Sequence, residues 1–424
     1  MRFRITVRPN FLSPPLWVSL ALVAVCVPKG AGAQDAKPLY TETFHDLYEK
    51  LGAHYPGLGL KKIDWKAVGE QLLPRAKDVK TDEQFGLLVC ELVARLEDSH
   101  AYVAPGTAKP PRVAFPQWDA GFACLVDDRG KPVVYHVDRK GPAAAVGLRP
   151  GVTVVKIDDK AADQAIDETM KHASRYASFS SERLLRYQST RWFVRQHEHG
   201  KKVKFEFQDT RGRVRKVTLP CTLGVSYLPR LPVPVAGASD SANVSWTKLK
   251  GNVGYIYVRR IRNDLIARLD AAVGELAGVK GMIIDVRGNS GGGFDSRRSH
   301  VNFDRESKQE PDRPRFKGPM AVLIDARCIS AGEGWTSWFI AKKRARVFGQ
   351  ATAGASSRKT THTLKNGMYK VTFPVKLYRG YLDRPIERVG LVPDVPVMQN
   401  AKDLSNGKDT VLETARQFLM SKPG

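Results

Sequence analysis

The chain has 424 residues, of which 42% are hydrophobic and 26% are charged. This length fits two or three domains, and the composition excludes a chain that is disordered throughout. With 68 basic and 43 acidic residues, the net charge is +25. Because the basic residues are spread along the chain and no nucleic-acid-binding motif occurs, we expect a basic surface and no nucleic-acid partner.

Residues 1–33 have the pattern of a signal peptide. Arginines precede a short apolar run, Leu16–Val27, and the small residues Ala31–Ala33 stand just before Gln34. This order predicts cleavage after Ala33 and an exported protein, periplasmic or extracellular, without a stable membrane span. An uncleaved anchor and a lipidated Cys26 are the alternatives.

Residues 34–111 are predicted to form an N-terminal helical unit. Apolar residues recur at helical spacing over 44–51 and again over 85–96, the second time after a start signal at Thr81-Asp82. The unit ends at Asp98-Ser99-His100, a strand-like Ala101–Val103 follows, and the Pro-rich 105–111 is typical of a linker.

Residues 112–225 are predicted to form a β domain. Its strands surround a small-residue segment, Gly141–Gly151, and one of them ends in Ile157-Asp158. This combination resembles a PDZ-like domain, which implies that an extended polypeptide substrate could add a strand to its sheet edge. A structural module without peptide binding is the alternative, and the stretch 162–200 is long for such a domain.

Residues 226–245 are predicted to be a linker, and 246–424 an α/β core. Strand and helix patterns alternate in this last part, which is typical of a sheet covered by helices. The predicted elements are strands at Val253–Val258, Gly281–Val286 and Met320–Ile324, and helices at Leu265–Leu276 and Ser330–Ile340.

Two motifs in the α/β core could carry chemistry. A glycine cluster, 291–293, follows the apolar strand that ends near Asp285; glycines let backbone N–H groups approach an oxyanion, although such a cluster can also be a flexible turn. Ser330 begins a helix after a buried strand, where the positive helix end would favour a nucleophile. Ser330 and Glu333 also fit a capping box, so Ser330 could be only a helix cap.

Together these motifs resemble the C-terminal-processing (tail-specific) serine peptidase family, which includes the core of tricorn protease. The resemblance covers about residues 40–400 and implies a ClpP/crotonase-like α/β catalytic core after the helical unit and the PDZ-like domain. It rests on four ordered segments: Asp285–Asn289 with its glycines, Ile329–Glu333, Arg346–Gly354 and Glu387–Asp394.

The resemblance implies that Ser330 attacks a peptide carbonyl and forms an acyl-enzyme. The backbone N–H groups of Gly291, Gly292 and Ala331 would then form the oxyanion hole. The lysine that serves as base in the bacterial branch is absent, since its place reads Gly354-Ala355-Ser356-Ser357.

The tricorn-like branch instead uses a histidine at the end of the helical unit, and Asp98-Ser99-His100 matches that motif. The resemblance therefore implies that His100 is the base, that Ser99 orients its imidazole, and that Glu387 is the closing acid. Asp383 is a second candidate for this acid.

No metal or organic cofactor is expected for this chemistry. Two rival functions stay open: a non-catalytic relative that binds a lipid-like or peptide ligand, and an esterase for small substrates. The oligomeric state is not indicated. The four cysteines after the signal segment could pair, for example Cys124 with Cys221, or stay free with Cys90 and Cys328; Cys328 is expected to be buried and not a nucleophile.

Overall fold

The structure is a computed structural model that describes residues 39–111, 116–224, 228–293 and 297–421. We call 39–111 the N-terminal region, 116–224 the middle region and 228–421 the C-terminal region. The predicted signal peptide, with Cys26, lies outside the described residues. Within the described ranges, no helix is both long enough and apolar enough to span a bilayer.

The N-terminal region is helical, as its apolar spacing predicts. Asp64 caps the third helix and Thr81 caps the fourth. Each side chain accepts a hydrogen bond from the backbone N–H of the third residue after it. The apolar faces of the helices meet in one buried cluster. The helices are α1 (Tyr40–His54), α2 (Leu58–Lys61), α3 (Trp65–Lys77) and α4 (Asp82–Ala94).

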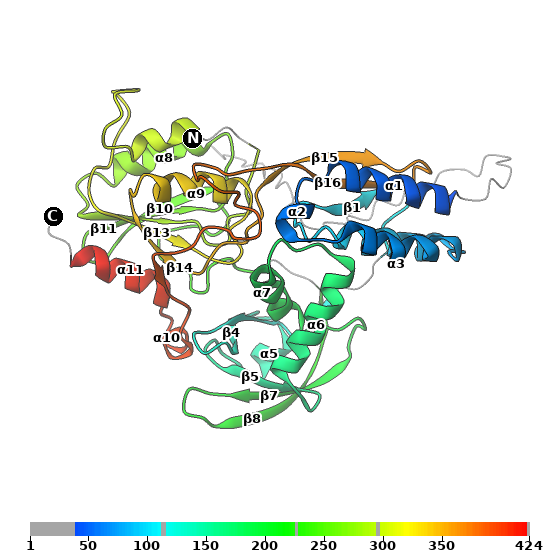
Figure 1. Ribbon diagram of the computed structural model, residues 1–424. Helices are drawn as coiled ribbons and strands as arrows, with labels where there is room; N and C mark the ends of the chain where they lie inside the picture. The colour runs from blue at the N-terminus through cyan, green and yellow to red at the C-terminus, as the bar shows by residue number, and fades with distance from the viewer. Residues whose placement is uncertain (1–38, 112–115, 225–227, 294–296, 422–424) are drawn as a thin grey trace, which may run out of the picture. The chain divides into compact units, whose positions relative to one another are not determined.

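The N-terminal region ends in a strand that joins the C-terminal region. β1 (Tyr102–Pro105) pairs antiparallel with β16 (Tyr369–Leu377), which in turn pairs with β15 (Ser357–Thr363). Figure 1 shows β1 beside this hairpin. The predicted Pro-rich linker therefore begins inside a sheet, and the residues just before β1 are fixed to the C-terminal region.

The middle region is a sheet with helices against it. Its strand order is β3-β4-β5-β7-β8, so β3 is an edge strand with β4 as its one neighbour. The long stretch after β5 forms two helices, α6 and α7, which explains its length. The elements are β2 (Trp118–Asp119), β3 (Phe122–Val126), β4 (Pro132–Val137), α5 (Pro142–Ala145), β5 (Thr153–Ile157), β6 (Lys160–Ala161), α6 (Ala162–Tyr176), α7 (Glu182–Trp192), β7 (Lys202–Gln208), β8 (Val214–Pro220) and β9 (Leu223–Gly224).

The C-terminal region contains a six-stranded sheet in the order β10-β11-β12-β13-β14-β17. All neighbours are parallel except β10 and β11. Parallel strands that are covered on both faces have continuous apolar sequences, and the strands of this sheet show that pattern. The elements outside the β15–β16 hairpin are β10 (Val244–Leu249), β11 (Val253–Val258), α8 (Leu265–Glu275), β12 (Gly281–Asp285), the 3-10 helix η1 (Arg297–Asn302), β13 (Met320–Ile324), α9 (Ala331–Ala341), β14 (Arg346–Gly349), β17 (Val395–Pro396), α10 (Ala401–Ser405) and α11 (Thr410–Met420).

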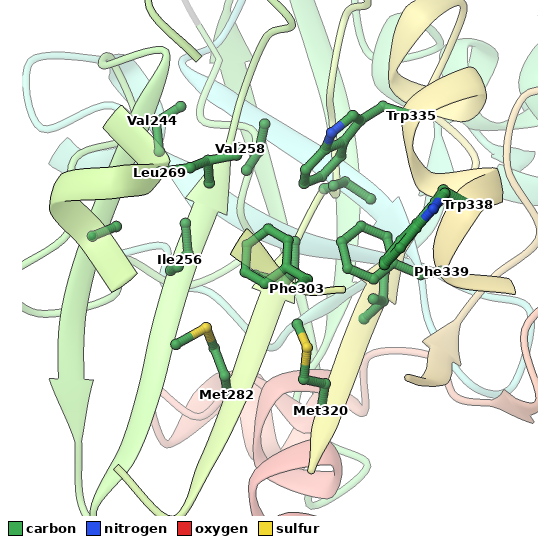
Figure 2. Close-up of a cluster of buried hydrophobic side chains, with 14 of the residues drawn as sticks. Val244, Ile256, Val258, Leu269, Met282, Phe303, Met320, Trp335, Trp338 and Phe339 are labelled. Atoms are coloured by element: carbon green, nitrogen blue, oxygen red, sulfur yellow. The ribbon is translucent and has the colours of Figure 1, made fainter. Parts of the chain in front are cut away.

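Two buried clusters lie on opposite faces of this sheet. Alternate strand residues pack against α8 and α9 on one face and against α11 on the other. Figure 2 shows the first cluster, where Trp335, Trp338 and Phe339 of α9 face strand residues such as Met282 and Met320. The predicted linker, 226–245, also contributes to a core. Its Leu231 and Val235 are buried in the second cluster, together with residues of α11.

A buried histidine stacks inside the first cluster. The His300 ring lies 4.6 Å from that of Trp338 and 5.5 Å from that of Trp335, at interplanar angles of 15° and 17°. Its Nε2 is 3.0 Å from the backbone oxygen of Trp335. Burial lowers the pKa of His300 to about 4, so the ring is neutral at physiological pH.

Candidate active site

Ser330 stands in the tight turn between β13 and α9. Its backbone has φ 61° and ψ −127°, a strained conformation for a residue with a side chain. Two hydrogen bonds from its N–H hold the turn, one to the backbone oxygen of Ala355 at 2.7 Å and one to Oε2 of Glu333 at 3.2 Å. The serine hydroxyl is thereby presented at the positive end of α9.

Glu333 does more than cap the helix. Its fully buried carboxylate also accepts hydrogen bonds from Thr352 Oγ1 at 2.5 Å and from the N–H groups of Gly354 at 2.7 Å and Ala355 at 2.9 Å. Burial raises the pKa of Glu333 to about 7, although these hydrogen bonds oppose the rise. Glu333 thus ties the 352–355 loop to the Ser330 turn; the S-x-x-E pattern was its signal in the sequence.

His100 lies beside Ser330. Nε2 of its ring is 3.0 Å from Oγ of Ser330, although the two residues are 230 positions apart. The His100 residue is 7% exposed. Burial lowers the pKa of His100 to about 4, and the positive charges of Lys359 and Lys61 contribute, while Asp98 opposes the shift. A neutral imidazole at physiological pH is the form that can accept the Ser330 proton.

Asp98 is the carboxylate that faces the other nitrogen of the ring. Its Oδ1 lies 3.8 Å from Nδ1 of His100 and accepts the His100 backbone N–H at 2.9 Å. Its Oδ2 accepts the Tyr55 hydroxyl at 3.0 Å. Nδ1 itself has no hydrogen-bond partner in the described structure. If Nε2 accepts from Ser330, the proton of the neutral ring is on Nδ1, toward Asp98. Sequence reasoning assigned no role to Asp98.

Ser99 and Glu387, expected to act on His100, have other partners. Ser99 and Ser180 exchange two hydrogen bonds of 2.9 Å between side chain and backbone. Glu387 accepts from Lys61 Nζ at 2.7 Å. In the described part of the chain neither side chain hydrogen-bonds to the His100 ring, because both are directed to neighbours on other segments. The alternative acid, Asp383, is exposed.

Lys61, Asp98 and Glu387 form one buried charged cluster behind the histidine. The Lys61 ammonium lies 3.6 Å from Asp98 and 2.7 Å from Glu387, and all three side chains are 0–1% exposed. Burial and the nearby Asp98 charge raise the pKa of Glu387, while Lys61 opposes the rise. The neighbouring Ser180 hydroxyl opposes it too, so Ser180 lies near Glu387 as well as Ser99. Lys61 carried no signal in the sequence, because its role depends on contacts between distant segments.

The glycine loop lies against Ser330. A Cβ atom on Gly291 would be 2.7 Å from Cβ of Ser330, and one on Gly292 would be 1.7 Å from the backbone oxygen of Ile261. The Gly291 N–H, however, donates to Oδ1 of Asn289 at 2.8 Å. The expectation that Gly291 is an oxyanion donor is therefore wrong for this arrangement, because its hydrogen is already used. Ala331 is the first residue of α9, where a helix leaves its N–H groups without helical partners.

The cysteines and the possible metal ligands of the described residues were both predicted from the sequence to take no part in the reaction. Cys90, Cys124, Cys221 and Cys328 are all free and buried. Burial raises the pKa of the Cys328 thiol well above its usual range, which disfavours the reactive thiolate. In the described ranges no group of three or more His, Cys, Asp or Glu side chains is arranged to hold a metal ion.

Comparisons with known proteins agree with this arrangement of elements. Residues 252–397 match the model described as peptidase family S41. A curated protein of Streptomyces coelicolor, described as a homolog of tricorn protease, is 21% identical over 420 residues, which cover 90% of this chain. The chain spans only 32% of the length of that relative.

Two solved structures share the fold. The crystal structure of mature CPAF has a TM-score of 0.65 at 12% identity and covers 90% of this chain and 96% of that chain. The crystal structure of a candidate peptidase from Parabacteroides merdae has a TM-score of 0.53 at 17% identity, with the same coverage of 90% and 96%. The predicted mixed α/β fold of several parts is confirmed at this level. Residues 252–397 therefore match peptidase family S41, and the chain is similar in sequence to a tricorn protease homolog and in fold to mature CPAF.

Proposed function

We propose that the chain is an exported serine endopeptidase that cleaves polypeptides, with Ser330 as nucleophile and His100 as base. The observation that carries this proposal is the 3.0 Å separation of the Ser330 hydroxyl and His100 Nε2 at the start of a helix. A strained serine in a strand–turn–helix corner beside a neutral buried histidine is an arrangement that favours acyl transfer.

In the first half of the reaction, His100 takes the hydroxyl proton as Ser330 attacks the carbonyl carbon. The oxyanion that forms lies at the positive end of α9, where the N–H groups of Ala331 and Gly292 are the proposed donors. The imidazolium created at this moment is buried, so it needs a nearby negative charge. Asp98 supplies it, and Tyr55 and Lys61 hold Asp98 in place.

In the second half, His100 gives its proton to the leaving amine and the amine departs, which leaves an ester on Ser330. A water molecule then attacks the ester carbonyl, with His100 again as base, and the acid product and free Ser330 are formed. Ser99 and Glu387 are positioning residues in this scheme. They act through Ser180 and Lys61, which connect them to the backbone turn that carries His100.

The substrate is proposed to be an extended polypeptide, bound in part by the middle region. β3 has β4 on one side and no strand on the other among the described residues, so it offers an edge for strand addition. Export is proposed from the signal-like residues 1–33, and N-terminal sequencing of the secreted protein, expected to begin at Gln34, tests it.

A fluorophosphonate probe tests the proposed chemistry, because it reacts covalently with activated serines. We expect wild type and a His172→Ala control, altered on the exposed face of α6, to be labelled equally. Ser330→Ala should abolish labelling, and His100→Ala should slow it at least about 10²-fold. Folded wild type that stays unlabelled would favour the non-catalytic binding protein. Hydrolysis of small esters, without cleavage of unfolded polypeptides, would favour the esterase.

A further inference from the structure

A cavity of about 210 Å³ lies between the middle and C-terminal regions. On one side it is lined by the end of β3, at Leu125 and Val126, and by the face of α7. The opposite wall comes from the ends of the C-terminal strands, such as Ile324 of β13. A polypeptide strand added to the edge of β3 would therefore bring side chains to this cavity.

The charged residues of the lining are Arg183, Arg186, Arg191, Arg230 and Arg287, with Asp325 as the single acidic residue. Arg287 is neutralised by ion pairs of 2.6 Å with Asp285 and 2.8 Å with Asp409. Asp325 accepts the backbone N–H groups of Gly288, Arg327 and Cys328. The lining therefore has more positive than negative charge, and an anion would be attracted to it.

Arg191 is the clearest contributor to this excess of positive charge. The residue is 6% exposed, yet among the described residues no carboxylate forms an ion pair with it. Its guanidinium donates to the Tyr187 hydroxyl at 2.9 Å and lies 5.3 Å and 5.5 Å from the ring centres of Tyr135 and Tyr187. The charge of Asp325 favours the cation from a distance, but a buried cation is costly without a direct ion pair, and a carboxylate in the cavity would supply one.

The cavity is also connected to the nucleophile. Arg183, in its lining, donates from Nε to the backbone oxygen of Thr352 at 2.5 Å. The same loop, 352–355, is held by Glu333 and accepts the Ser330 N–H at Ala355. A chain segment seated against Arg183 therefore lies one loop away from the reacting serine.

We propose that this cavity selects acidic polypeptides, by binding an aspartate or glutamate side chain of a substrate that lies along β3. The inference rests on the proposed function and names its substrate class. Arg186 and Arg191 contact the carboxylate, while Leu125 and Val126 contact the stem of the side chain. Neutral and basic segments, which offer Arg191 no carboxylate, bind more weakly.

Fluorescence anisotropy on full-length Ser330→Ala protein tests the proposal without turnover. Three unstructured peptides of equal length are compared, one rich in Glu, one in Ser and one in Lys. We expect the Glu peptide to bind at least about tenfold more tightly than the Ser peptide, and the Lys peptide to bind most weakly. Equal affinity for the three peptides would overturn the proposal.

A charge-matched pair of variants locates the binding. Arg186 is partly exposed and has only an exposed ion pair of 3.5 Å with Asp167, so Arg186→Glu should fold normally. Arg211→Glu makes the same charge change in the β7–β8 turn, away from the cavity lining. Loss of the Glu preference in the first variant alone supports the cavity; equal loss in both assigns it to overall charge and refutes the proposal.

Two further outcomes separate this inference from the proposed function. Inorganic phosphate that displaces the Glu peptide at millimolar concentration, when sodium chloride of equal ionic strength does not, would make the cavity a small-anion site and overturn the polypeptide assignment. Acid-selective binding by Ser330→Ala, with no fluorophosphonate labelling of wild type, would keep the cavity and reject the peptidase. Fluorophosphonate labelling of wild type, without any preference for acidic peptides, would keep the peptidase and reject the cavity as a site for acidic segments.

Discussion

The low pKa of His100 predicts how the reaction rate depends on pH. The imidazole acts as base only when neutral, and burial lowers its pKa from an ordinary 6.5 to about 4. At about pH 5, a group with a pKa of about 4 is about 90% neutral, whereas a group with an ordinary pKa is about 3% neutral. Wild type should therefore keep at least half of its plateau rate at about pH 5.

The assay is the second-order rate of fluorophosphonate labelling of Ser330 between about pH 4 and pH 8, with circular dichroism at each pH to confirm that the protein is folded. Lys359→Gln provides an internal test, because the Lys359 charge contributes to the lowered pKa of His100. Its removal should move the acid limb of the profile to higher pH. A folded wild type whose rate at about pH 5 is a few per cent of the plateau would refute this account of the His100 environment.

Three other predictions follow from contacts around the site and the core. Asp98→Asn should slow labelling about 10²-fold, whereas exposed Asp383→Asn should leave it unchanged, and the same rate measurement compares them. Gly291→Ala should abolish labelling in a folded protein, because its Cβ would lie 2.7 Å from that of the nucleophile at φ +72°; Gly293→Ala, with no atom within 4 Å, should not. Folded His300 has a pKa of about 4, below the ordinary 6.5, so the unfolded chain binds a proton at this site more strongly than the folded one. The free energy of unfolding is therefore unaffected above about pH 6.5 and falls as the pH drops toward 4. Urea unfolding should therefore show wild type losing about 2 kcal/mol more than His300→Phe between about pH 7.5 and pH 5; parallel losses would contradict the assignment.

The proposed nucleophile and base could be suggested from the sequence because each stands where one predicted element ends and another begins. Ser330 follows a buried apolar strand and begins a helix, and His100 ends a helical unit with a polar triplet. Such signals depend on neighbours within a few residues, which the sequence displays directly. A family resemblance then supplied the pairing of the two, which no local pattern contains.

The acid behind His100 was harder to predict because its position depends on several segments at once. Asp98 is oriented by Tyr55 and Lys61, and Glu387 is held by Lys61. These contacts join residues from helix α2, the end of the helical unit and a loop more than 280 positions later. Sequence spacing carries no information about which of two carboxylates faces a ring nitrogen, so Glu387 was preferred there on resemblance alone.

The glycine loop illustrates a similar limit. Its glycines indicated a close backbone approach, and Gly291 does approach Ser330 closely. Which N–H groups stay available depends on the Asn289 side chain, whose Oδ1 already accepts the Gly291 hydrogen. One side-chain rotation decides whether such a donor is available or used, and the sequence does not contain that rotation.

The pairing of β1 with β16 has a consequence for the time at which the site appears. The ribosome makes the chain from its N-terminus, so His100 is complete long before Ser330, and β1 lacks its sheet partner until Leu377 has been added. A nascent chain thus first contains His100 without Ser330. For a further interval it contains both residues but lacks β16, the strand that holds the segment after His100. If Ser330 and His100 carry out the proposed reaction, the chain cannot hydrolyse its own unfolded sequence before both residues and β16 have been made.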